Sequence, residues 1–278
     1  MDKKTSATGI LRLATEPNIP FQDLKTEKLL CYDCEQRFSR LETFFATNIF
    51  YPYVKEELDE YGCAQGKIKQ FAYDEQLLKF VLSVQWRAAV TVKNSLSAPL
   101  QAQFQNSISN WRKFLLDEAD NSGPGLSYLV FMQNLAAAEG DLSCMPDQIN
   151  HYVLRSCDGT PVIMGSKEVF MYSKIGPLAM FTAIQPHKIK NISETRIKIH
   201  GKISTVQRVM NSNIGQWMYI TRPKEALSHL KFSANQKSKI AEKWKNPTPK
   251  MLESMTVKMT ESDVMMKRGY KLIKNDAM

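Results

Sequence analysis

The stretch that decides the fold is "LLCYDCEQRFSRLETFFATNIFYPY", Leu29 to Tyr53. It places Cys31 and Cys34 in a C-x-x-C pair, directly before a run in which apolar residues recur at spacings of three and four. This spacing predicts an amphipathic helix from Glu35 that stops at Pro52, because residues three and four apart share one helix face. Paired cysteines at the start of that helix supply half of the ligands that a structural zinc ion requires.

The other ligands of such a site must come from elsewhere in the chain. We expect Cys31, Cys34 and Cys63 to be metal ligands and zinc to be the cofactor. The more distant candidates are Cys144, Cys157 and His151. A thioredoxin-like redox pair is disfavoured, because the prolines of the preceding segment do not supply the βα unit that such a motif follows. Two buried free cysteines are the plainer alternative.

A resemblance to a known family sharpens this interpretation. The stretch "LLCYDCEQRFSRLETFFATNIFYP" resembles the second zinc knuckle of HNH-type (ββα-metal) endonuclease-like proteins, specifically a bacterial group with the pattern "LLCxxCExRFSxxExxFA". The segments Phe80–Val90, Asn110–Leu116 and Phe232–Trp244 are similar to other parts of that group. The resemblance implies zinc, a nucleic-acid partner and a place in a bacterial defence or mobile-element system.

The chain also departs from that family. Its first histidine is His151, it has no earlier C-x-x-C, and Glu35 stands where classical HNH-type nucleases carry a helix histidine. We therefore assign no catalytic residue and expect an inactive relative of HNH endonucleases. One alternative is an active zinc-dependent nuclease completed by remote residues, with Glu35, Arg37 and His151 as contributors. Another is a missing half supplied by a second chain or by upstream sequence.

The rest of the chain predicts an α+β fold. An HNH-like or treble-clef-like module with its knuckle and helix is expected over residues 1–60, and an α+β domain over 61–278. Helices are expected within 74–119, where Asp74 caps one and Pro99 starts the next. Short apolar runs over about 126–184 predict an antiparallel sheet of about four strands, including a hairpin in "HYVLRSCDGTPVIM" that turns at Asp158-Gly159.

The final part, 200–278, is expected to be a basic helical tail. From Lys224 onward twelve Lys or Arg residues face six Asp or Glu residues, in a chain of net charge +9. Ser233 is suited to cap a lysine-rich helix there. Because lysine and arginine release the counterions of phosphates, this charge predicts nucleic acid as a partner. The expected contact residues are Arg37, Trp217, Arg222, Lys224, Lys237, Lys239, Lys243 and Lys245.

Several classes of protein are disfavoured. No apolar run reaches the roughly 18 residues that a membrane span needs, and the first residues lack the apolar core of a signal peptide, so we expect a cytoplasmic protein with no membrane partner. The chain has no G-x-S-x-G, Walker A or G-x-G-x-x-G motif. The remaining rival is a protein-interaction subunit, or a homo-oligomer, whose basic tail binds an acidic protein instead of nucleic acid.

Overall fold

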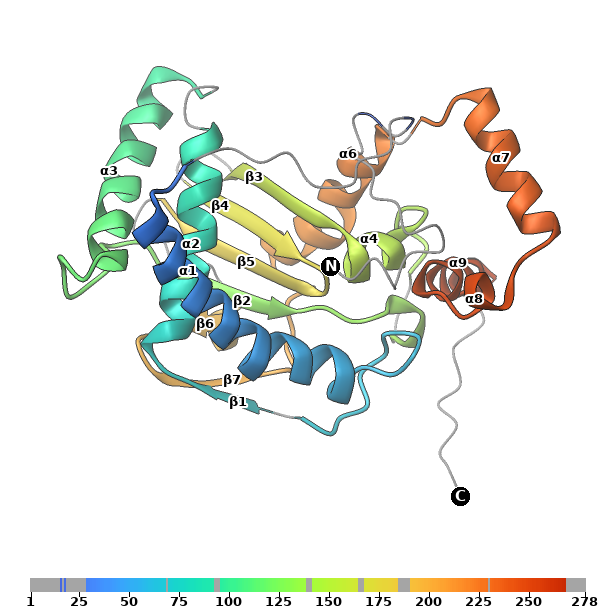
Figure 1. The fold of residues 1–278 in the computed structure, drawn as a ribbon, viewed down its shortest axis with the longest axis horizontal. Helices are drawn as coiled ribbons and strands as arrows, with labels where there is room; N and C mark the ends of the chain where they lie inside the picture. The colour runs from blue at the N-terminus through green and yellow to red at the C-terminus, as the bar shows by residue number, and fades with distance from the viewer. Residues whose placement is uncertain are drawn as a thin grey trace.

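The computed structural model describes residues 16, 18, 29–68, 70–92, 96–138, 142–164, 168–184, 191–229 and 231–268. As the sequence predicts, the architecture is α+β with an antiparallel sheet, here of five strands in the order β3-β4-β5-β2-β6 (Figure 1). The strands are β2 (Ser127–Phe131), β3 (Cys157–Met164), β4 (Glu168–Ile175), β5 (Leu178–Ala183) and β6 (Arg196–Ile197). Of the predicted N-terminal module, residues 1–28 apart from 16 and 18 lie outside the described residues. So do residues 269–278 of the predicted tail.

The sheet is covered on both faces. Every residue of β2 and β5 is buried, which explains why these strands are continuous apolar runs rather than alternating ones. Strands β4 and β5 form a hairpin in which Ile175 pairs with Leu178. Gly176 occupies that turn with φ +56°, a conformation that glycine adopts without steric cost.

One face is covered by α2 (Glu75–Val92), and α1 (Tyr32–Phe45) and α3 (Ala98–Leu115) pack on α2 (Figure 1). The ring of Phe45 stacks on that of Phe80 with the centroids 3.8 Å apart. Hydrophobic side chains of α1 thus belong to the same core cluster as those of the sheet. The predicted boundary at residue 60 stays a prediction, and within the described residues it does not separate two cores.

The opposite face is covered by α4 (Ile149–Arg155), α5 (Asn213–Gln216), η7 (Trp217–Thr221) and α6 (Arg222–Ser228). Strand alternation decides which side chains face each layer. The Ser173 hydroxyl donates to Gln85 of α2 (3.2 Å), whereas the neighbouring Tyr172 ring contacts Trp217 of η7. The fold is therefore a sheet between two helical layers.

The other elements are η2 (Ala46–Phe50), η3 (Tyr53–Glu57), β1 (Gln70–Tyr73), η5 (Leu135–Ala137), η6 (Ser193–Thr195), β7 (Gly201–Ser204), α7 (Ala234–Lys245), α8 (Pro249–Leu252) and α9 (Met255–Lys267).

The predicted hairpin at Asp158-Gly159 is wrong. Its first half forms the helix α4, in which Ile149, Tyr152 and Val153 are buried at helical spacing, and its second half is the single strand β3. Asp158 and Gly159 pair along β3 with residues of β4 instead of turning. The β-branched and aromatic residues of this segment suit either structure, so packing against the sheet decides for the helix.

Strand β3 lies at an edge of the sheet, and its free side is poorly suited to adding another strand. The Gly159 N–H is already bonded to the Asp158 carboxylate (2.8 Å), and Pro161 has no N–H. Residues two apart direct their backbone groups to the same edge. Two consecutive donors are thus missing from this edge, a common protection against edge-to-edge association.

Two further predictions need correction. The first helix does not stop at Pro52 but continues to Glu57 through wide turns in η2 and η3. The Tyr51 N–H bonds to the Ala46 carbonyl five residues back, and this wider spacing accommodates the donor that Pro52 lacks. The tail is not wholly helical either, because β7 pairs with β1 in a second, two-stranded sheet. None of the helices in the described ranges has the length and apolarity to cross a bilayer.

Candidate functional site

The two cysteines of the C-x-x-C pair lie together at the start of α1. Cys31 is the exposed N-cap residue and Cys34 is half-buried in the first turn. The backbone N–H and the thiol of Cys34 stabilise the thiolate of Cys31 and lower its pKa, whereas the same thiol contact raises the pKa of Cys34. The pair could therefore provide two ligands to a zinc ion.

Cys63 does not join this pair, and its assignment as a metal ligand stays a prediction. It is buried in the loop after η3, at the far end of the helical run from Tyr32 to Glu57. At about 1.5 Å per residue, this run is roughly 35–40 Å long. Within the described ranges, no group of three or more His, Cys, Asp or Glu side chains could hold a metal ion. The described ligands do not fit a complete zinc site, and no metal chemistry follows from them.

Zinc analysis of cysteine variants tests this separation. We expect the Cys63→Ser variant to carry the same zinc content as the native chain, because its side chain lies at the other end of the helix. The Cys31→Ser, Cys34→Ser double variant should lose any zinc that the native chain binds. Plasma mass spectrometry after dialysis measures both. Loss of zinc from the Cys63→Ser variant alone would contradict the geometry.

Residues proposed for an active nuclease are not brought together. Arg37 on α1 donates to Asp117 (2.7 Å) and to the Leu115 carbonyl (3.1 Å), and so attaches α1 to the end of α3. His151 lies on α4, whose Tyr152 contacts Tyr172 on the face of the sheet opposite α2. Burial lowers the pKa of His151 to about 4, with the charges of Arg155 and Lys174 acting in the same direction. The sheet therefore separates His151 from Glu35 and Arg37.

Two of the predicted nucleic-acid contact residues already have partners within the fold. Trp217 packs edge-on against Tyr172 (5.0 Å between centroids) and Phe181 (6.3 Å), so its ring packs against the sheet. Arg222 forms two hydrogen bonds to the Asp158 carboxylate, of 2.8 and 2.7 Å. Both side chains are thus engaged within the fold, and their assignment as nucleic-acid contacts stays a prediction. The neighbouring Lys224 is exposed on α6.

A buried polar cluster under α4 was not predicted from sequence. The Tyr152 hydroxyl donates to Asp158 (2.7 Å), and Lys174 donates to the carbonyls of Ser156 (3.2 Å) and Gly176. Burial lowers the pKa of Lys174 to about 7. For Asp158, burial acts to raise the pKa, but hydrogen bonds and charge from Arg222 lower it overall. The only sequence signal was a lysine inside an apolar strand.

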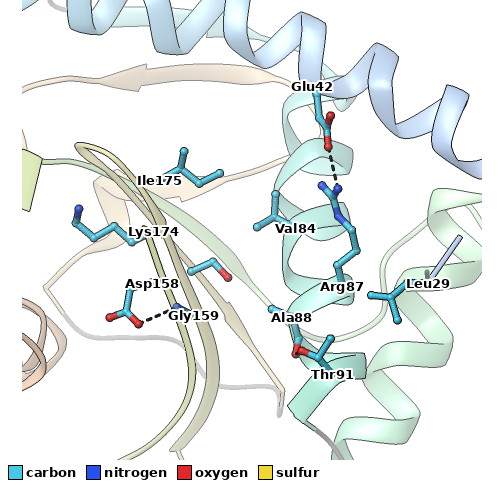
Figure 2. Close-up of a pocket in the computed structure, with 11 residues that line it drawn as sticks. Leu29, Glu42, Val84, Arg87, Ala88, Thr91, Asp158, Gly159, Lys174 and Ile175 are labelled. Carbon is cyan, nitrogen blue, oxygen red and sulfur yellow. Dashed lines mark hydrogen bonds and ion pairs between the residues drawn. The ribbon is translucent and has the colours of Figure 1, made fainter. Parts of the chain in front are cut away.

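A cleft of about 610 Å³ opens between α2 and the β3–β4 edge (Figure 2). Its walls include Val84, Ala88 and Thr91 of α2 and Gly159 of β3. Arg87 points along the cleft to Glu42, with which it forms an ion pair (2.8 Å). Figure 2 shows Lys174 and Asp158 extending to the other side of the strands. Of the hydroxyl groups on the cleft wall, that of Thr91 donates to the Ala88 carbonyl and that of Ser173 donates to Gln85, so neither is paired with a base.

Helix α7 is the most distinctive surface feature. It stands apart from the sheet at one side of the molecule (Figure 1), and none of its residues is buried. Ser233 caps it as predicted, accepting from the Gln236 N–H (3.2 Å), and the Ser233 N–H donates to Asn18 (2.8 Å). The helix exposes all four of the predicted lysines, which are Lys237, Lys239, Lys243 and Lys245.

The α7 lysines are also electrostatically unbalanced. In the ranges that the structure describes, none of the four forms an ion pair, whereas Lys79, Lys258 and Lys267 do.

Comparisons with protein families, with curated proteins and with solved structures found no match to this chain.

Proposed function

We propose that this protein associates with nucleic acid through the lysines of α7, and that it binds nucleic acid without cleaving it. The observation that carries the proposal is a helix that buries none of its residues and exposes four lysines without an ion-pair partner among the described residues. Phosphates neutralised by lysine release condensed counterions, which favours binding. The resemblance of the C-x-x-C stretch to HNH-type endonuclease-like proteins points to the same class of partner.

The physical chemistry of α7 favours a ligand over a merely solvated surface helix. An isolated helix of about 12 residues is marginally stable in water, because most helical stability in proteins comes from a packed face. Lys239 and Lys243 are four residues apart, where like charges destabilise a helix. Polyanion binding would remove this repulsion, so the same lysines that weaken the free helix would stabilise the bound one.

Replacing the four lysines with glutamine tests the proposal. We expect the Lys237→Gln, Lys239→Gln, Lys243→Gln, Lys245→Gln variant to bind oligonucleotides at least tenfold more weakly at 100 mM salt. The slope of log K against log salt should fall by about 3, because each phosphate contact contributes about 0.7–0.9. Fluorescence anisotropy at several salt concentrations measures both quantities.

The matched control removes the same charge elsewhere. Lys67, Lys113, Lys198 and Lys202 are exposed and lie outside α7. The corresponding fourfold glutamine variant should keep most of the native affinity. Equal weakening of the two variants would show that only net charge matters and would contradict a role for α7. If the native chain has no affinity for DNA or RNA, nucleic-acid binding is excluded and a protein-interaction subunit is the remaining class.

A further inference from the structure

The exposed tryptophan of α7 points to the form of nucleic acid that the helix binds. Trp244 is 41% exposed, whereas Trp111 is only 1% exposed and Trp217 packs against the sheet. Ile240 lies four residues before Trp244, so the two side chains share one face of α7. At about 100° per residue, Lys237 and Lys243 lie roughly 60° to either side of Ile240. An apolar pair with an open indole is therefore flanked by positive charge on both sides.

We infer that α7 binds single-stranded nucleic acid, with the indole of Trp244 stacked on a base and Lys237 and Lys243 on flanking phosphates. This inference rests on the proposed function, and it names the kind of nucleic acid. Bases in a duplex are stacked on each other, so an indole on a helix surface cannot reach their faces. In a single strand these faces are open, and aromatic side chains stack on them with little dependence on sequence.

The arrangement on α7 fits a strand better than it fits a duplex. Lys237 and Lys243 are about 9 Å apart along the helix axis, which lets both ammonium groups reach the backbone around one stacked base. A duplex would meet the lysines but would leave the Ile240–Trp244 face against polar phosphates. The apolar face would then oppose binding instead of contributing to it.

The test compares a fluorescein-labelled 20-nucleotide oligo(dT) with a 20-base-pair duplex at matched salt. We expect Trp244→Ala to weaken oligo(dT) binding by roughly 5- to 150-fold, the range that loss of one base–aromatic contact gives. Duplex binding should change less than twofold. Trp244→Phe should restore most of the affinity. The control Leu252→Ala, which removes another exposed apolar side chain (49% exposed), should bind like the native chain.

The outcomes separate the two proposals. Unchanged oligo(dT) binding by Trp244→Ala, with binding lost in the fourfold lysine variant, would overturn the stacking inference and keep the proposed function. Equal loss for single strand and duplex would overturn the preference for single strands. No binding of either nucleic acid by the native chain would overturn both proposals, and binding only to phosphatidylserine vesicles would do the same. Circular dichroism confirms that each variant is folded, since Trp244 is at the surface.

Discussion

The Arg222→Ala variant should be about 3–5 kcal/mol less stable than the native protein at neutral pH. The Asp158 and Arg222 side chains are 11% and 21% exposed, so removal of the guanidinium leaves a buried carboxylate without its countercharge. Breaking a buried pair in this way is far more costly than the net contribution of the pair itself. Urea unfolding followed by circular dichroism measures the loss as a lower midpoint.

The pH dependence of that loss has a definite sign. The folded pKa of Asp158 lies below its usual value, so the stabilisation by this pair is present above about pH 4 and is lost as the pH falls through the lower folded pKa. In the Arg222→Ala variant, acid protonates the stranded carboxyl group. The difference between variant and native protein should therefore shrink as the pH is lowered toward 3.

Two further variants serve as controls for this prediction. Lys224→Ala, an exposed neighbour on the same helix, should change stability by less than about 0.5 kcal/mol. The Asp158→Asn, Arg222→Ala double variant should be more stable than Arg222→Ala alone, because the stranded charge is gone. If Arg222→Ala and Lys224→Ala unfold at the same urea concentration, the contact between Arg222 and Asp158 does not stabilise the fold.

The elements that sequence predicts correctly are those set by local patterns. Helix α2 begins after Asp74, whose carboxylate accepts from the Gln76 N–H (2.9 Å), and α3 starts with Pro99 in its first turn. Strands β4 and β5 are apolar runs separated by a glycine turn. In each case the periodicity, the cap and the turn lie within about 20 residues. Local physical chemistry is therefore enough to place them.

The elements that sequence misses depend on partners far along the chain. Among the described strands, β1 pairs only with β7, and Phe71 of β1 pairs with Ile203 of β7, which lies 132 residues further along the chain. Asp158 looks like a turn residue until Arg222 is placed beside it. Trp217 and Trp244 both stand near lysines in sequence, yet Trp244 is exposed whereas Trp217 packs against the sheet. Burial, which separates these cases, is a property of the whole fold.

The Asp263→Asn variant should remove a pH dependence of about 3 kcal/mol from the stability of the native protein. Asp263 of α9 is 7% exposed, and one of its oxygens accepts from the backbone (3.1 Å) and side-chain (2.9 Å) amides of Asn150 on α4. Among the described residues its other oxygen has no hydrogen-bond partner. Burial, opposed by the Asn150 bonds and the charge of Lys267, raises the pKa from 3.8 to about 6.

The sign follows from the raised pKa. Because the folded protein holds this proton more tightly than the unfolded chain, the contribution of Asp263 is fully present below about pH 4 and is lost as the pH rises through about 6. Asparagine keeps the acceptor oxygen but cannot ionise, so the variant should be the more stable of the two above pH 7. Urea unfolding from pH 4 to 8 measures both curves. The control Glu261→Gln, exposed on the same helix, should follow the native curve. Parallel curves for the native protein and Asp263→Asn would contradict the prediction, because they would show that the Asp263 carboxyl group does not titrate differently in the folded and unfolded chains.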